Sequence, residues 1–130
     1  MFYEIDKNSR PSEKDCIFLC SHEPCSLCLS AITFSGFDNF YYLFSYNLTN
    51  TEFSIPHDLK ILKEVFKVNN GEYNKENSYW KSNSIKMLIE ELSTLKKEKF
   101  MNQLEEIKKS YIILSNKYQA SKNKNLIPLK

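Results

Sequence analysis

Two cysteines spaced three residues apart are the side chains best suited to chemistry in this chain of 130 residues. Cys25 and Cys28 directly follow Pro24 and open an apolar stretch. Proline suits the first position of a helix, because it lacks an N–H group and its φ angle already fits. Residues i and i+3 share one face of a helix. We therefore expect both thiols on one face of a first helical turn.

The chemistry open to such a pair depends on the thiols and on the helix end. Free N–H groups and the positive end of the helix dipole favour thiolates. Two thiolates in a C-x-x-C spacing can hold one tetrahedral zinc ion. They can also act as a redox dithiol after a strand, or pack as two cysteines without chemistry. The spacing alone leaves all three interpretations open.

The elements around the pair predict a strand, a helix and a second strand. Residues 16–20 form a short apolar run of strand length. Cys16 and Cys20 would lie on one face of it, where we interpret both as packing residues. Gly36 fits just beyond the end of a helix. Residues 40–46, FYYLFSY, carry aromatic side chains on both faces and indicate a central strand. A helix between two strands predicts that they run parallel with a right-handed crossover.

The rest of the chain reads as mainly helical. Residues 47–54, NLTNTEFS, predict a polar loop, and residues 56–68 show the apolar period of a helix. Residues 84–121 contain no glycine or proline and carry a long apolar stripe. We expect a helix that either breaks near residues 96–99 or extends outward as a coiled-coil arm.

Composition and charge exclude several classes of protein. No apolar run approaches the roughly 20 residues of a membrane span, and no signal peptide precedes the first strand. We therefore expect a cytoplasmic protein with reduced thiols, in which metal or redox chemistry is favoured over disulfides. Residues 81–130 hold 11 basic and 5 acidic residues, a net +6. We interpret this charge as a solvated helical face and do not expect nucleic acid or a membrane as partner.

The wider string SHEPCSLCLSAI resembles the P-C-x-x-C half of the zinc-dependent cytidine and deoxycytidylate deaminase superfamily, which also holds the guanine and tRNA-adenosine deaminases. In that family a strand leads into an E-P-C-x-x-C turn, an apolar helix and another strand. Glu23, Pro24, Cys25 and Cys28 match the turn. The resemblance covers residues 15–46.

The resemblance implies hydrolytic removal of an amino group from a nucleobase or nucleoside. Cys25 and Cys28 would be two of three protein ligands to Zn²⁺, with water in the fourth position. His22, Tyr46 and Asn47 are the candidates for substrate contact. Glu23 matches the family's E-P-C glutamate, which is not its proton shuttle.

The same comparison reveals a gap. The family's third zinc ligand and its proton-shuttling glutamate lie in an H-x-E or C-x-E motif at the start of the preceding helix, and this sequence contains neither motif. The resemblance thus implies the C-terminal part of a deaminase, inactive alone, with an upstream deaminase fragment or a second copy of the chain as partner.

We therefore expect an α/β fold: a truncated cytidine-deaminase-like sandwich, with two parallel strands and their crossover helix, in residues 1–56. A helical C-terminal region would follow in residues 57–121, and a flexible tail in residues 122–130. One alternative is a non-enzymatic remnant or interaction protein that uses its long C-terminal helix. A dithiol redox protein is disfavoured, because the proline precedes the two cysteines and does not lie between them.

Overall fold

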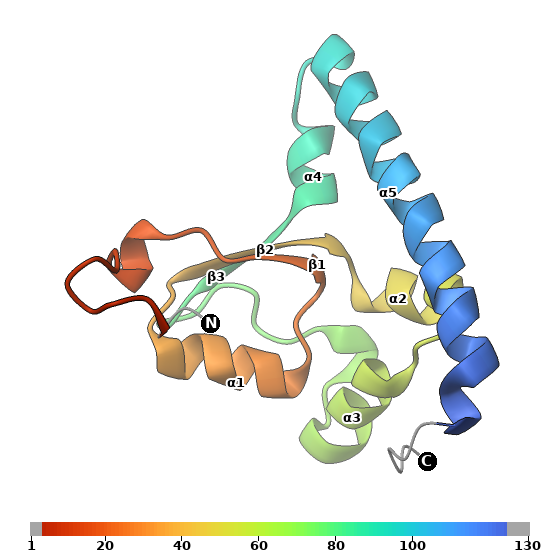
Figure 1. The fold of residues 1–130 in the computed structure, drawn as a ribbon, viewed down its shortest axis with the longest axis horizontal. Coiled ribbons are helices and arrows are strands. Elements are labelled where there is room, and N and C mark those ends of the chain that lie inside the picture. The colour runs from red at the N-terminus through yellow and green to blue at the C-terminus, as the bar shows by residue number, and fades with distance from the viewer. Residues whose placement is uncertain (1–3, 125–130) are drawn as a thin grey trace.

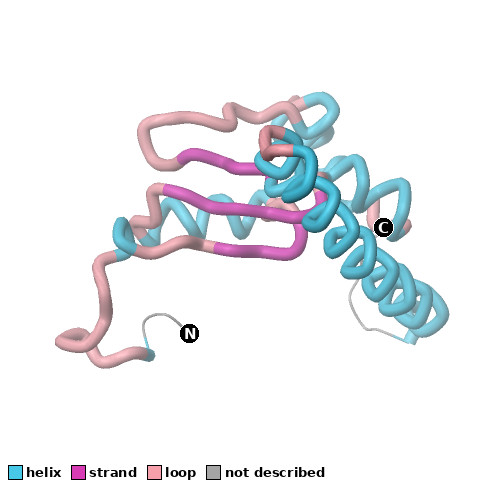
Figure 2. Tube along the Cα trace, turned by 90° about the horizontal axis from the view of Figure 1, so that it is seen from above, coloured by secondary structure: helices cyan, strands magenta, loops and turns pink. Residues whose placement is uncertain are grey.

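A three-stranded parallel sheet organises the fold. The computed structural model describes residues 4–124. The strands are β1 (Leu19–His22), β2 (Asn39–Phe44) and β3 (Lys81–Ser84), in the spatial order β1-β2-β3. Figure 2 shows them side by side, with β2 in the middle. The helices are α1 (Ser26–Ser35), α2 (Tyr46–Phe53), α3 (His57–Phe66), α4 (Ile85–Glu90) and α5 (Thr94–Ser121).

The unit β1-α1-β2 confirms the predicted parallel pair of strands joined by a helix. Leu19 lies opposite Tyr41 in the ladder, and His22 lies opposite Phe44. Gly36 ends α1 in the left-handed conformation, with φ of 84°, as expected for a glycine beyond the last turn. Strand β1 begins three residues later than the strand predicted at residues 16–20, because residues 19–22 are the ones that form the ladder with β2.

The start of α1 differs from the prediction by two residues. The helix begins at Ser26, so Pro24 is not its first position. Cys25 precedes the helix as its cap, with extended φ and ψ angles of −61° and 167°. Its sulfur accepts a hydrogen bond from the N–H of Cys28, which is the geometry of an N-cap side chain.

The prediction of a loop at residues 47–54 is wrong, because α2 occupies most of that range. Ser45 ends the preceding strand early and caps α2, with its Oγ accepting from the N–H of Leu48 at 3.3 Å. Tyr46, Thr49 and Phe53 are all buried along one side of the helix. Burial of that side stabilises a helix whose Asn and Thr residues have low helix propensity.

The region predicted to be helical after residue 56 also contains a strand. β3 pairs in parallel with β2, from Asn39 opposite Lys81 to Tyr42 opposite Ser84. The long helical stripe breaks at residues 91–93, earlier than the predicted 96–99. Helix α4 and the first part of α5 project away from the sheet, and α5 then runs back past α2 (Figure 1). The domain division at residue 56 stays a prediction. Of the predicted tail, residues 122–124 form a 3-10 turn and residues 125–130 lie outside the described residues.

Two apolar clusters hold the layers together. The first lies between α1 and the sheet and contains Ile32, Phe40 and Trp80. The indole N–H of Trp80 donates to Thr33 Oγ1 at 2.8 Å, so a buried polar group keeps a partner. The second cluster joins Phe44, Phe53, Ile89 and Leu104, and so connects the sheet to α2, α4 and α5. Within residues 4–124, no helix combines the length and the apolar character that crossing a membrane requires.

Candidate functional site

The two sulfur atoms of the predicted pair meet at the head of α1. Cys25 Sγ and Cys28 Sγ lie 2.9 Å apart, and both cysteines are free. The N–H of Cys28 donates to Cys25 Sγ at 3.3 Å. A residue at the cap and another in the first turn are held in this relation by the backbone. Local structure therefore suffices to bring the thiols together.

The structure does not support the predicted preference for a thiolate at Cys28 in the metal-free chain. Partial burial, followed by the hydrogen bond from Cys25, raises the pKa of the Cys28 thiol to about 11. Redox-active dithiols depend on a lowered thiol pKa. That requirement falls on the attacking thiol of a pair, so the raised pKa of Cys28 does not separate a redox dithiol from a metal site in which the ion displaces the thiol proton.

The other two cysteines pack as predicted. Cys16 and Cys20 lie against the first apolar cluster. Cys16 Sγ donates to the carbonyl of Ser12 at 3.3 Å, and Cys20 Sγ donates to the carbonyl of Tyr41 at 3.2 Å. Burial raises the pKa of Cys20 to about 11. These thiols are structural, and they serve as internal controls for the pair in α1.

Glu23 anchors the turn that carries the cysteine pair. Its side chain is 3% exposed. Oε2 accepts the backbone N–H of Tyr46 at 3.0 Å, and Oε1 accepts the hydroxyl of Tyr73 at 2.9 Å. Lys75 forms an ion pair with the same Oε1, and its ammonium lies 3.7 Å from the centre of the Tyr73 ring. Both carboxylate oxygens of Glu23 therefore hold partners within the fold, which fits its expected exclusion from proton transfer.

Tyr46, predicted to contact substrate, lies in the core beside the turn. Its hydroxyl donates to the carbonyl of Pro24. Burial, followed by the negative charge of Glu23, raises the pKa of its phenol. Gly71 closes against the same ring: a Cβ there would lie 2.6 Å from Tyr46 Cδ2, and its φ is +72°. Only glycine fits that position without strain.

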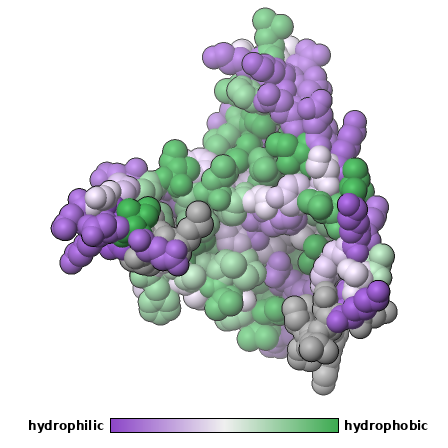
Figure 3. Space-filling model, in the orientation of Figure 1, coloured by the Kyte–Doolittle hydropathy of each residue, from purple (hydrophilic) through white to green (hydrophobic). Residues whose placement is uncertain are grey.

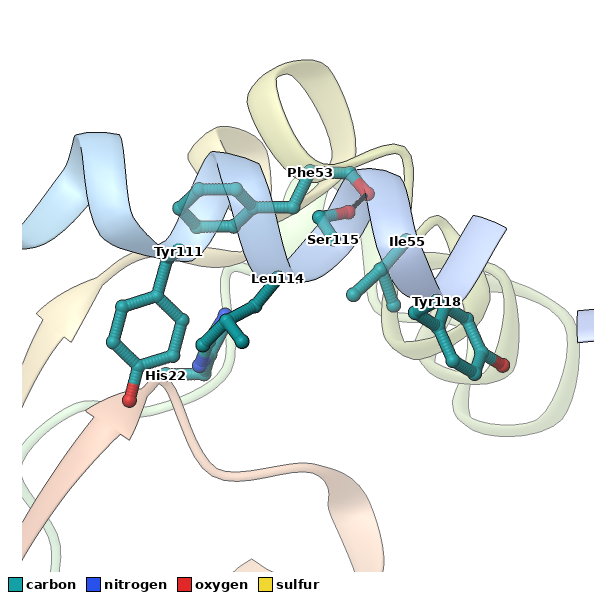
Figure 4. A pocket seen from close by; sticks show the side chains of 7 residues that line it. All are labelled: His22, Phe53, Ile55, Tyr111, Leu114, Ser115 and Tyr118. Carbon is teal, nitrogen blue, oxygen red and sulfur yellow. Dashed lines mark hydrogen bonds between the residues drawn. The ribbon is translucent and has the colours of Figure 1, made fainter. Parts of the chain in front are cut away.

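His22 and Asn47, the other two candidates, face different hollows. His22 lines a cavity of about 180 Å³ between β1, α2 and α5, together with Phe53, Tyr111 and Leu114 (Figure 4). Its ring packs edge-on against Phe44, Phe53 and Tyr111, with centroids 5.1–5.5 Å apart. Asn47 is exposed and lines a separate hollow with residues of α2 and α5. The three predicted substrate residues therefore do not gather around one point.

The cysteine pair fits one edge of a zinc tetrahedron. With Zn–S bonds of about 2.3 Å, tetrahedral geometry separates two sulfurs by about 3.8 Å. The observed 2.9 Å places both thiols on the same side of the helix head, so a small side-chain rotation reaches that separation. Among residues 4–124 no group of three or more His, Cys, Asp and Glu side chains is placed to hold a metal ion. The described residues thus provide two ligands and leave the remaining positions to other donors.

Sequence reasoning missed the residues that support the turn from far along the chain. Tyr73 and Lys75 lie 50 and 52 residues after Glu23. Asp58, at the head of α3, lies close enough to raise the pKa of Cys28 through its negative charge. None of these residues stands in a local pattern that points to Cys25, so no sequence signal could have identified them.

Comparison with known proteins adds no relative. No protein-family model, curated protein or solved structure matches the chain.

Proposed function

We propose that this chain is a zinc-dependent deaminase-type protein that holds the ion through Cys25 and Cys28 and acts on an amino-substituted nucleobase or nucleoside. One observation carries the proposal. A parallel strand leads through an E-P-C-x-x-C turn into an apolar helix and a second parallel strand, and the two sulfurs of the turn converge to 2.9 Å. This order of elements and motif is the one that the deaminase resemblance requires.

The chain's own residues would position the metal ligands. Cys25 caps α1, and the N–H of Cys28 donates to its sulfur. Backbone N–H groups at a helix head favour negatively charged ligands, so they would stabilise the thiolate forms once the protons are displaced. Glu23 would hold the whole turn against β2 and the segment before β3. A bound zinc ion supplies a Lewis acid that lowers the pKa of a coordinated water to near neutral.

A third ligand and a proton-shuttling carboxylate would have to come from outside these 130 residues. The sequence contains no H-x-E or C-x-E motif. Glu23, the carboxylate closest in sequence to the pair, is fully engaged by Tyr46, Tyr73 and Lys75. We therefore propose that the chain alone binds zinc weakly and turns over no substrate, and that activity depends on complementation.

Zinc analysis with matched cysteine variants tests the first half of the proposal. Zinc bound to the wild-type chain is measured by equilibrium dialysis at a fixed concentration of free zinc. We expect the C25S/C28S double variant to lose the bound zinc and the C16S/C20S double variant to retain it. Equal zinc content in the two double variants would contradict the assignment of the ligands.

Complementation tests the second half. The chain is mixed with a synthetic fragment that carries a strand followed by a His-x-Glu helix. Ammonia release is then measured with cytidine, cytosine, guanine and adenosine. We expect release with at least one substrate, and its loss in C25S/C28S. Absence of ammonia with all four substrates, in a mixture shown to form a complex, would refute the deaminase proposal.

A second candidate function is partner binding through α5. This helix of 28 residues exposes large apolar side chains at Ile113 and Leu114. A complex that forms without nucleobase turnover, and that is lost in an I113E/L114E variant, would favour this function over deamination.

A further inference from the structure

The outer face of α1 carries an apolar seam that the described residues leave uncovered. Leu27 is 77% exposed and Phe34 is 91% exposed. With Ala31 they stand at positions i, i+4 and i+7, which form one stripe along a helix. In Figure 3 apolar residues gather over α1, in the lower part of the view. We call Leu27, Ala31 and Phe34 the α1 seam.

A shallow groove between α1 and α3 borders the α1 seam. It has a volume of about 220 Å³ and is lined by Ser30 of α1 and by Leu62, Phe66 and Val68, among others. Phe66 is 55% exposed and extends the apolar surface from α1 onto α3. A ridge beside a groove is the shape that helix packing uses.

The charge of this surface favours a second copy of the chain as its occupant. The ten residues of α1 contain no Asp, Glu, Lys or Arg, and neither do the seven residues that line the groove. A two-fold axis brings identical surfaces together, so any charge on them would face its own copy. A neutral surface avoids that repulsion, and it also lacks the charges that select a different partner.

We propose that two copies of the chain associate through their α1 seams, with the helices antiparallel across a two-fold axis. Leu27 of one copy then lies opposite Phe34 of the other. Ala31 lies at the centre of the seam, and Ser30 lies beside it at the edge of the groove. Their small side chains allow the helix axes to approach within the usual 8–10 Å.

The area available matches what a stable interface needs. With about 200 Å² for a fully exposed large side chain, Leu27, Phe34 and Phe66 together offer roughly 450 Å² per copy. A symmetric pair would therefore bury about 900 Å² from these three residues alone, and Ser30, Ala31 and the groove bring the total above the roughly 1,000 Å² expected of a specific interface. The cysteine pair is not counted in this area.

The oligomeric state of the full-length chain tests the proposal. Light scattering after size exclusion, or sedimentation, is performed across micromolar concentrations with wild type, L27E and F34E. The matched control is L95E, because Leu95 is 83% exposed on α5, far from α1 in sequence. We expect wild type and L95E to have twice the chain mass of 15.4 kDa, and L27E and F34E to have the mass of a single chain. Far-ultraviolet circular dichroism confirms that all variants stay folded.

Any of the following results would overturn the proposal. The first is a wild-type chain that stays monomeric, the second is a dimer in folded F34E, and the third is loss of the dimer in L95E. The same measurements in chelator and in C25S/C28S separate this proposal from the zinc-dependent function: we expect the dimer to persist in both. A dimer that is lost with zinc would instead place the contact at the cysteines and refute the seam.

Discussion

Replacing Glu23 should weaken the whole turn, although no sequence pattern links this residue to its partners. Its carboxylate accepts from the Tyr46 N–H and the Tyr73 hydroxyl and pairs with Lys75. In Glu23→Ala the buried Tyr46 N–H loses its only acceptor among the described contacts. An orphaned buried donor costs about 1–3 kcal/mol.

The other losses are smaller. Tyr73 keeps a contact with Ser82 Oγ at 3.3 Å, and the Lys75 side chain, 41% exposed, can turn toward water. The void left by the side chain adds a further term. We therefore expect Glu23→Ala to lower the free energy of unfolding by about 3 kcal/mol, against a total of roughly 0.05–0.15 kcal/mol per residue. Glu23→Gln keeps an acceptor oxygen and should cost about 1 kcal/mol.

Urea unfolding followed by circular dichroism measures both variants, with Glu76→Ala as control. Glu76 pairs with Lys81 at 3.3 Å on the surface, where such pairs contribute about 0–1 kcal/mol. The reasoning fails if Glu23→Ala costs no more than Glu76→Ala. It also fails if Glu23→Gln costs as much as Glu23→Ala, because the acceptor would then not be the cause. Zinc affinity should follow the same order as the loss of stability.

Three more predictions concern single residues around the turn. Burial lowers the pKa of His22 below its ordinary 6.5. The unfolded chain therefore binds the proton first, and the free energy of unfolding should fall as the pH drops below about 6.5. Urea midpoints at about pH 7 and about pH 5 measure this fall, which should be absent in His22→Phe. Gly71→Ala should cost about 1–3 kcal/mol in urea, because φ is +72° and a Cβ would collide with the Tyr46 ring; an unchanged midpoint would contradict the close approach. Ser45→Ala should cost about 1 kcal/mol by loss of the α2 cap, whereas Ser45→Asp should restore most of it, as thermal unfolding can measure.

The local features of the site could be predicted from the sequence. The apolar strand, the capped helix and Gly36 depend on residues close together in the chain, and the spacing of Cys25 and Cys28 alone brings their sulfurs to one helix turn. A cap residue and the residue three positions later lie side by side through local backbone geometry, and this placement needs no tertiary contacts. The parallel pairing of β1 and β2 follows in the same way from the short helical connection between them.

Only the tertiary structure decided which residues support that turn. Glu23 meets Tyr73 and Lys75 because β3 returns the chain to the sheet beside β2, and residues 81–84 carry no alternating apolar pattern that would predict a strand. α2 forms because the burial of Phe53 outweighs the weak helix propensity of the residues around it. Burial depends on contacts between distant segments, and a sequence pattern records only which side chains prefer it. The same reason explains the α1 seam: its apolar residues were visible in the sequence, but their exposure became known only when every other element had found its place.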